Sequence, residues 1–433
     1  MKRFGFIIVI IYSLTVTSSF SQNVDSLYEI ATWQGFSSAA ISFTFDDGYA
    51  KQYSIAEPIF DKYNFKITFF PVINWGPDWT ALQKAANKGH EVGSHTVSHP
   101  QYGSIDQEQQ NFELSNSINS INSHISGQNC ITMAYPYCQT GDDSITGKYF
   151  LAARICSGQI VSKTPSNFMR ISSFVCGSLG INSVAEYFRQ FNSAANSRGW
   201  VVLLIHDLDD SGYSPVNSSM LETVVDSLGT FKDKFWVSSF GNVARYIKER
   251  NSVNVSELSL SDSVITVSIT DSLDNSIYNI PVSVRRQLPF GWASATVMQN
   301  GDTLTSSIKM IDSLKYIIFD AVPDEGDIQI KNAVITDVEN SGISKPETGY
   351  LMQNFPNPFN PETTIKYRIV KSSFVKLEIF DSLGRRVSTL VNSYQLAGNY
   401  RVNFNAADLT SGIYFYRLSG DDFSFSKKMS LLK

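Results

Sequence analysis

Apolar residues between about residues 37 and 250 follow two alternating patterns. Short continuous apolar segments, typical of buried strands, are separated by longer segments whose apolar residues recur at helical spacing, as at Ile55, Ala56, Ile59, Phe60 and Tyr63. Repeated strand–helix units predict an α/β fold with a parallel sheet, and about seven of them suit an open or closed barrel. The strands are expected at residues 39–45, 67–72, 91–94, 131–135, 151–155, 201–205 and 235–237.

The pattern changes after residue 250, where apolar and polar residues alternate instead. This change predicts a small all-β, sandwich-like module over residues 251–338. Phe290 and Trp292 are candidate platforms for sugars, which would make the module carbohydrate-binding. With so few other aromatic residues, a spacer is the interpretation we favour. The alternation is clearest at residues 263–269, 282–284 and 316–319.

A second small all-β module is expected at the end of the chain. Residues 339–349 contain Gly342, Pro346 and two serines, the composition of a linker. Residues 350–433 open with a proline-rich run that forbids a central strand. Alternating segments then predict antiparallel strands at residues 364–370, 375–380, 400–404 and 413–418.

The first residues have the pattern of a secretory signal peptide over residues 1–21. Lys2 and Arg3 precede a short apolar segment that ends in small residues. A membrane anchor is the weaker alternative, because a bilayer span needs about 20 apolar residues. No later segment is long and apolar enough, so we expect no transmembrane segment in the mature chain. Residues 22–250 are then the α/β domain.

Net charge and cysteine content indicate which partners and which disulfides to expect. The formal net charge of −5 is spread along the chain without a long basic run, so we expect no nucleic-acid partner. Export would expose the cysteines to an oxidising compartment, and because they fall in one stretch we expect them to staple one domain. Four cysteines allow three pairings, among which the sequence does not choose. They are Cys130, Cys138, Cys156 and Cys176.

Polar residues that suit catalysis follow several predicted strands. Asp46 and Asp47 follow the first strand, where an Asp-Gly pair could equally be a turn. His95 and His99 lie at a predicted strand–helix junction, and we expect both on one face of the first helical turn, close enough to share a metal. Zinc sites commonly use three protein ligands, so one aspartate would complete the site and the other would act as general base.

Two further strand ends carry candidate residues. Pro136 fixes the backbone so that the amide of Tyr137 can point into the site as an oxyanion donor; a plain loop with a rigid proline is the alternative. The apolar strand that ends at Ile205 is followed by His206, either a core histidine or a general acid for the leaving group.

Taken in order, Asp-Asp, His-x-x-x-His, Tyr-Pro-Tyr and Leu-Ile-His resemble the polysaccharide deacetylases of carbohydrate esterase family 4, the NodB-homology domain. The segments ISFTFDDGY, ITFFPV, GHEVGSHTVSH and WVVLLIH carry the resemblance, across roughly residues 39–250. It implies a distorted (β/α) barrel of seven or eight strands. It also implies a metal-dependent hydrolase that removes N- or O-acetyl groups from a carbohydrate polymer.

The same resemblance implies roles for the matching positions. Asp46 would be the catalytic base and His206 the catalytic acid, and the metal would most often be zinc. The remaining matches are the metal ligands Asp47, His95 and His99, and the oxyanion and acetyl-pocket residues Pro136, Tyr137 and Leu204.

The sequence departs from the family in two places. Ala134 stands where the family has an arginine that orients the catalytic aspartate. Arg154, at the next strand end, is our candidate for a compensating cation; a salt bridge at the barrel rim is the alternative. No tryptophan lies between Cys138 and Cys176, so the usual aromatic residue of the acetyl pocket is missing, and the family's aspartate that tunes the catalytic histidine is not assigned.

Two other functions stay open at this point. A deacetylase scaffold without its arginine would be a catalytically weak or inactive carbohydrate-binding surface protein. Two histidines and one carboxylate also bind iron in oxygenases. Asp46 and His206, beside an intact ligand set, favour hydrolysis over both.

The last region resembles a second family. The segments QNFPNPFNPETTIKY, DSLGRRVSTLV, AGNYRVNFNA, LTSGIYFYRLSG and KKMSLLK occur in this order and are similar to the type A C-terminal sorting domain of the type IX secretion system. The resemblance implies that the type IX machinery is a partner. It also implies that the chain is secreted or held at the outer cell surface.

Overall fold

A computed structural model describes residues 27–209, 212–312, 314–333 and 349–433 of the 433-residue chain. The expected signal peptide lies outside these residues, and so does the expected linker apart from Gly349. The chain divides after residue 335 into two compact units. None of the helices in the described part of the chain is long and apolar enough to span a bilayer.

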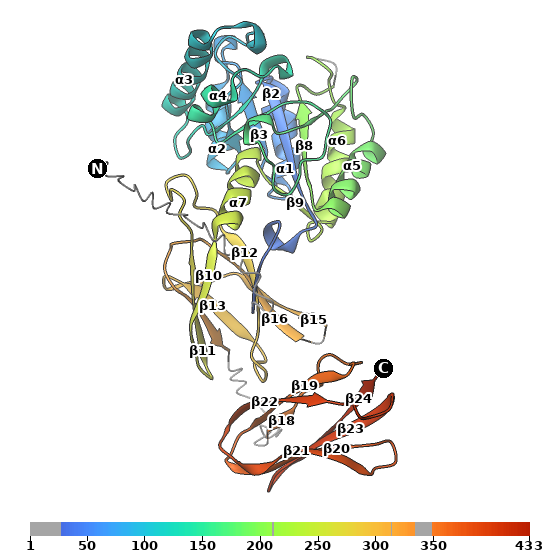
Figure 1. The fold of residues 1–433 in the computed structure, drawn as a ribbon. Helices are drawn as coiled ribbons and strands as arrows, with labels where there is room; N and C mark the ends of the chain where they lie inside the picture. The colour runs from blue at the N-terminus through green and yellow to red at the C-terminus, as the bar shows by residue number, and fades with distance from the viewer. Residues whose placement is uncertain (1–26, 210–211, 313, 334–348) are drawn as a thin grey trace, which may run out of the picture. The chain divides into compact units, whose positions relative to one another are not determined.

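The first unit begins with an α/β domain. Its parallel strands are β2 (Ala39–Asp47), β3 (Thr68–Pro71), β4 (Glu91–Val92), β5 (Thr132–Ala134), β6 (Ala152–Arg154), β7 (Phe174–Val175), β8 (Trp200–Ile205) and β9 (Phe235–Val237). Its helices are α1 (Glu57–Asp61), α2 (Trp79–Asn87), α3 (Gln107–His124), α4 (Asp143–Tyr149), α5 (Val184–Ser197), α6 (Ser218–Thr230) and α7 (Phe240–Ser252). Figure 1 shows α3 and α4 on one side of β2, β3 and β8, with α5 and α6 on the other.

The strands follow a barrel-like order. Neighbours in the main sheet run β4–β3–β2–β8–β7, and β9 also pairs with β2. Strands β5 and β6 form a separate parallel pair, joined to the rest by single bridges between Ser94 and Met133 and between Arg154 and Ile171. The buried centre explains the continuous apolar runs of β2 and β8. All seven predicted strands are present, each bounded within two residues of its prediction; β7, only two residues long, was not predicted.

An all-β module follows in the same compact unit. Its strands are β10 (Asn254–Leu260), β11 (Val264–Thr270), β12 (Val282–Gln287), β13 (Ala295–Gln299), β14 (Asp302–Leu304), β15 (Ser306–Ile311), β16 (Leu314–Ala321) and β17 (Ile328–Asn332). They form two sheets, one of which also takes in β1 (Tyr28–Ile30), a strand that the sequence pattern does not predict. Segments at opposite ends of this unit therefore share a sheet.

This β module shares a core with the α/β domain. Phe240, Val243 and Ile247 of α7 belong to the same buried cluster as Val282 and Val284 of β12. Figure 1 shows α7 beside β12, between the module and the parallel strands. The interpretation of Trp292 as a sugar platform is wrong, because that side chain is only 4% exposed and packs in the shared core.

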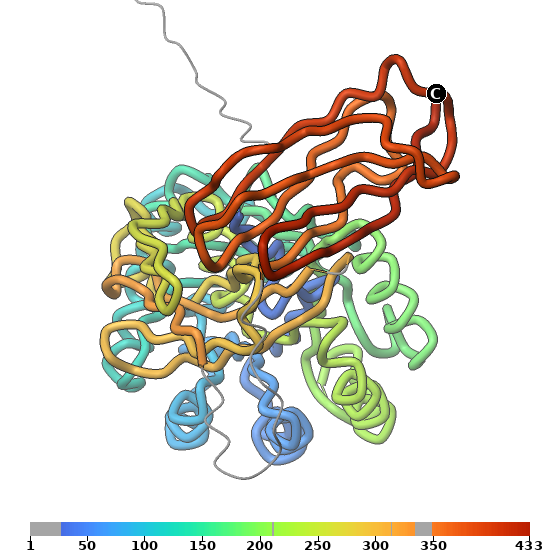
Figure 2. Tube along the Cα trace, turned by 90° about the horizontal axis from the view of Figure 1, so that it is seen from below, coloured from blue at the N-terminus to red at the C-terminus, as the bar shows by residue number. Residues whose placement is uncertain are grey.

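The second compact unit is an antiparallel β module. Its strands are β18 (Tyr350–Leu351), β19 (Glu362–Ile369), β20 (Ser373–Phe380), β21 (Arg386–Gln395), β22 (Gly398–Asn405), β23 (Gly412–Ser419) and β24 (Ser424–Leu431). They form one sheet in the order β18–β19–β22 and another in the order β21–β20–β23–β24. Figure 2 shows these strands running side by side. The four predicted strands are present, and the unit has a core of its own around Ile365, Leu377 and Tyr416.

Candidate active site

Strand β2 brings both aspartates to one end of the sheet. Asp46 is buried, and at Asp47 and Gly48 the backbone turns sharply, with φ angles of 76° and 82° in the left-handed region. Parallel strands end at a common edge, and the loops at their carboxyl ends carry the functional groups in folds of this class. The other candidate residues lie near or after the carboxyl ends of β4, β5, β6 and β8 at this edge.

His95 and His99 reach the edge from a loop. Our prediction that they lie on a first helical turn is wrong, because Thr96 and His99 have φ angles of 70° and 57°, which no right-handed helix contains. The next α-helix begins only at Gln107. The two histidines therefore converge because the loop folds back on itself.

Glu113 of α3 holds this loop, and sequence reasoning missed it. Its buried carboxylate accepts hydrogen bonds from the amides of Val97 at 2.8 Å and Ser98 at 2.9 Å, and from the Ser98 hydroxyl at 2.6 Å. A signal was available in the sequence. Glu113 lies between Gln110 and Ser117 at helical spacing on the buried face of α3, where an acidic residue needs a specific partner.

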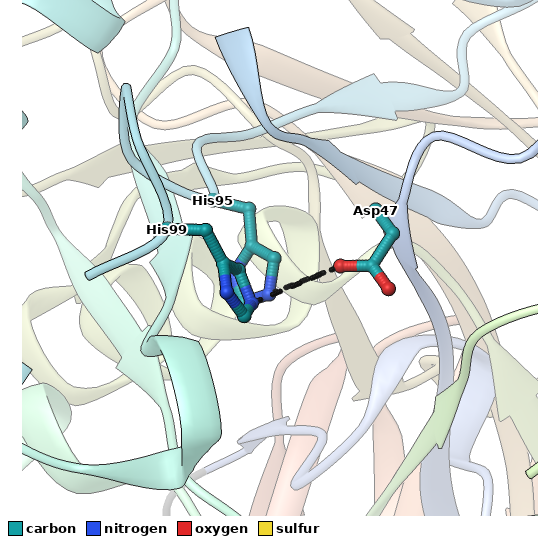
Figure 3. A group of neighbouring side chains, drawn as sticks. All are labelled: Asp47, His95 and His99. Atoms are coloured by element: carbon teal, nitrogen blue, oxygen red, sulfur yellow. Dashed lines mark ion pairs between the residues drawn. The ribbon is translucent and has the colours of Figure 1, made fainter. Parts of the chain in front are cut away.

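Asp47 faces the two histidines across the edge of the sheet (Figure 3). Its Oδ1 lies 3.7 Å from His95 Nε2 and 3.9 Å from His99 Nε2, and one ligand atom of each residue lies within 4.8 Å of the others. His95 Nδ1 is 2.8 Å from the carbonyl oxygen of Ala134, which places the proton on Nδ1 and leaves Nε2 free for a metal.

The charge states of these residues also fit a cation. Burial lowers the pKa of His95 to about 4 and also lowers the pKa of His99, so both imidazoles are neutral, the form that binds metals. Burial, reinforced by Asp46, raises the pKa of Asp47 to about 7. Within the described residues Asp47 Oδ1 is buried without a hydrogen-bond partner, and a bound cation would both satisfy it and hold it ionised.

Asp46 is paired with a buried cation. Arg154 Nη2 forms an ion pair with Asp46 Oδ2, and both side chains are almost fully buried. Burial by itself raises the pKa of Asp46. The positive charge of Arg154, with His95 and His206, outweighs this effect and holds the pKa below its ordinary value. Asp46 is therefore an ionised carboxylate inside the protein, as a general base must be.

The position of Arg154 explains how Asp46 can be paired with a cation although position 134 is an alanine. The two residues are direct partners in the parallel β5–β6 ladder, so the guanidinium comes from the neighbouring strand at the same height. Arg154 Nη1 also donates to Ser173 Oγ at 3.3 Å, and the guanidinium lies 5.7 Å from the centre of the Phe70 ring.

His206 lies directly after β8, near Asp46. Burial lowers its pKa, while the negative charge of Asp46 acts in the opposite direction. Its Nδ1 has no hydrogen-bond partner in the described part of the chain, so the tuning aspartate of the family is not found there. Leu204 is buried in β8, two residues before His206.

The loop after β5 brings Tyr137 next to His99. Pro136 is buried, and Tyr137 and Cys138 take left-handed φ angles of 52° and 58°. The Tyr137 ring lies 4.6 Å from the His99 ring. A disulfide between Cys138 and Cys156 ties this loop to the loop that follows Arg154.

The expectation that all four cysteines staple the domain is therefore wrong. Cys130 and Cys176 are buried thiols, and burial raises the pKa of both, so they are protonated core residues. Only the pair beside the candidate site is oxidised.

Three exposed aromatic rings, two of which sequence reasoning missed altogether, surround these residues. Trp75 lies 5.0 Å from the His99 ring and Tyr213 lies 4.9 Å from the His206 ring, while Tyr137 contacts His99 as described. Each of the three is more than half exposed. Exposed aromatic rings beside a polar site are suited to stack on the apolar faces of sugars.

A second carboxylate–histidine cluster lies elsewhere in the domain. Glu57, Asp61 and His90 are close enough to share an ion. However, Lys88 Nζ lies 2.6 Å from Glu57 and 2.7 Å from Asp61, and His90 Nε2 is 3.0 Å from Asp61. The lysine ammonium already forms ion pairs with both carboxylates, so we regard the cluster as structural.

An Asp–His–His ligand set beside an ionised aspartate and a histidine is typical of hydrolases that use a metal. In comparisons with known families, the polysaccharide deacetylase family matches residues 34–150, and the secretion system C-terminal sorting domain matches residues 353–431. The chain therefore carries a polysaccharide deacetylase domain of the NodB type and a type IX sorting domain. Arg154, Leu204 and His206 lie beyond the first match.

Individual relatives cover parts of the chain. A gellan lyase from a Bacillus species is 28% identical over 325 residues, which is 70% of this chain and 13% of the relative. A Bacillus subtilis (strain 168) protein, named provisionally as polysaccharide deacetylase YxkH, is 27% identical over 114 residues, 25% of this chain and 40% of the relative. The chain thus spans less than half the length of both curated relatives.

Among solved structures, one from Mycobacterium smegmatis, also named provisionally as a polysaccharide deacetylase, is 15% identical with a TM-score of 0.40. The match covers 51% of this chain and 94% of that structure.

Proposed function

We propose that this chain is a secreted, metal-dependent deacetylase that hydrolyses N- or O-acetyl groups of a carbohydrate polymer. The observation that carries the proposal is the convergence of Asp47, His95 and His99 next to Asp46, which is ionised by its contact with Arg154. The family match at residues 34–150 includes the first four of these residues. The pairing of Asp46 with Arg154 also argues against a scaffold that lost activity with its arginine.

Each residue then has a chemical task. A divalent metal held by Asp47, His95 and His99, most often zinc for such ligands, would polarise the acetyl carbonyl and acidify the attacking water. Asp46 accepts the proton of that water. His206, once protonated, gives a proton to the leaving amine or alcohol; burial lowers its pKa, which makes the imidazolium the stronger acid, while the Asp46 charge acts in the opposite direction.

The remaining site residues stabilise the oxyanion and shape the pocket for the acetyl group. The amide of Tyr137, set by Pro136, donates to the developing oxyanion, a contribution that can reach about 3 kcal/mol. Leu204 forms an apolar wall for the acetyl methyl group. The rings of Trp75 and Tyr213 support a sugar polymer as the substrate, since they extend the site beyond one acetyl group.

The proposal also covers the fold of the catalytic domain and the export of the protein. The parallel strands β2 to β8 would form the distorted barrel of the family, which is supported by a bridge from Ser94 to β5 and by another from Arg154 of β6 to Ile171, just before β7. After an N-terminal signal peptide has directed export, the sorting domain engages the type IX machinery, which delivers the enzyme to the outer cell surface or the medium.

Metal analysis tests the proposal directly. The purified protein should bind one zinc ion, and removal by a chelator should abolish acetate release, which added zinc restores. Asp47→Asn should weaken zinc binding, whereas Asp143→Asn, at a partly exposed carboxylate paired with Arg170, should not. Acetate release that persists in protein freed of metal would contradict the proposal.

A further inference from the structure

Gln52 is a fully buried polar side chain that the mechanism above does not use. It begins η2 (Gln52–Ala56), a π-helical turn that follows β2 and precedes α1. Such turns are rare and are frequent at functional sites. A buried amide here needs an explanation, because burying it without partners costs free energy.

The amide nitrogen of Gln52 joins the two residues that we assign as base and acid. Nε2 donates to the carbonyl oxygen of Asp46 at 2.5 Å and to the carbonyl oxygen of His206 at 2.6 Å. A side-chain amide has two N–H groups, so both of its donors are used, one on each residue. Because two acceptors face this atom, the amide can be placed only with its nitrogen on that side.

The Gln52 amide lies where the pairing of β2 with β8 ends. The parallel ladder between β2 and β8 ends at the pair Phe45 and Ile205. Asp46 and His206 are the next residues on each strand, where no ladder bond holds the chains together. The Gln52 amide joins the strands one step beyond the end of the ladder.

A neighbouring side chain strengthens the same connection. Lys51 Nζ donates to the carbonyl oxygen of Leu208 at 2.9 Å. Two successive residues of the turn after β2 therefore bind the segment that follows β8.

We propose that Gln52 is a positioning residue that fixes the separation between Asp46 and His206. The inference rests on the proposed function for the roles of those two residues. Proton transfer at both ends of one reaction requires both groups at hydrogen-bonding distance from the substrate, and a displacement of about 1 Å can cost about 100-fold in rate.

The test compares two glutamines of like chemistry in the zinc-loaded full chain. Gln52→Met removes both donors at similar length. Gln299→Met is the matched control, because Gln299 Nε2 also bridges two carbonyl oxygens, of Val322 at 2.6 Å and Gly326 at 3.5 Å, but in the β module. We expect Gln52→Met to lower kcat for acetate release from chitopentaose by about 10- to 100-fold, with KM and zinc affinity nearly unchanged. Gln299→Met should alter only the melting temperature.

A second variant covers the case in which Gln52→Met does not fold. Gln52→Glu keeps the shape of the side chain but has no donor when ionised and one when protonated. Its kcat relative to the wild type should therefore rise as the pH is lowered from 8 to 6, which a purely structural role would not produce. A ratio that stays constant, or a Gln52→Met enzyme with the wild-type kcat, would overturn the proposal.

Failure of the proposed function would be recognised separately. If the wild type releases no acetate, hydrogen exchange of residues 203–208 tests the bridge itself. Faster exchange in Gln52→Met than in Gln299→Met would support the positioning role, and equal exchange would overturn it.

Discussion

The ion pair between Arg154 and Asp46 is the residue-level contact on which the proposed chemistry most depends. Removing one partner of a buried pair leaves an uncompensated charge, so the base would lose both its orientation and its favoured ionisation. Arg154 is only 1% exposed, which argues against the alternative of a salt bridge at the barrel rim.

We predict that Arg154→Ala lowers kcat about 100-fold, because Asp46 would be displaced and partly protonated. Arg154→Lys should recover part of the loss by restoring the charge. Arg170→Ala, at a surface arginine paired with Asp143, is the control and should leave kcat unchanged. Equal activities of folded Arg154→Ala and wild type would contradict this assignment.

The site residues differ in how far the sequence could predict them. Asp46, Asp47 and the two histidines were predicted to meet because they follow strands that share one edge. The left-handed backbone of His99 and Tyr137 could not be predicted, since non-glycine residues take it only where tertiary contacts enforce it. For the histidine loop, that contact comes from Glu113, in the following helix.

At the scale of elements, Glu113 of helix α3 is bonded to the loop that carries the proposed metal ligands His95 and His99. We predict that Glu113→Ala lowers zinc affinity about 10- to 100-fold, because the loop amides lose their acceptor and His95 and His99 separate. Glu108→Ala, at an exposed position on the same helix, is the matched control. Isothermal titration with zinc would measure both, and equal affinities would show that Glu113 does not position the ligands.

Glu249 of helix α7 connects the α/β domain to the β module through one hydrogen bond, and we expect this connection to depend on pH. Glu249 Oε1 accepts a hydrogen bond from the Ile280 amide at 2.9 Å, and burial raises the pKa of Glu249 to about 7. Because the folded-state pKa lies above the ordinary one, this group's contribution to stability is complete below about pH 4.5 and is lost as the pH rises through about 7.

We therefore predict that Glu249→Gln, which keeps the acceptor, raises the free energy of unfolding at pH 8 by about 1 to 2 kcal/mol. At pH 5 the difference should be small. Glu222→Gln, at an exposed position in α6, controls for the loss of one surface charge. Urea unfolding at both pH values measures the effect, and an equal change at pH 5 would refute the titration of Glu249 as its cause.

At the scale of the whole molecule, the sequence predicted three folded regions, whereas the structure groups the first two into one compact unit. Alternation of apolar residues reveals strands but not which core their buried side chains enter, so the shared core at α7 and the pairing of β1 with β12 could not be predicted. The gellan lyase match, at 70% of the chain, is longer than the α/β domain and extends into the β module. Both the α/β domain and the β module therefore contain residues that are similar to that protein.

The central claim is tested most directly by acetate release from the first unit, a protein ending at residue 335, which omits only the separately folded sorting domain. N-acetylated chito-oligosaccharide and O-acetylated xylan would be compared, for the wild type and for Asp46→Asn. We predict release from at least one substrate, with a loss of about 100-fold or more in Asp46→Asn, as removal of a general base requires. Release that is unchanged in Asp46→Asn, or none from either substrate by zinc-loaded protein, would contradict the account.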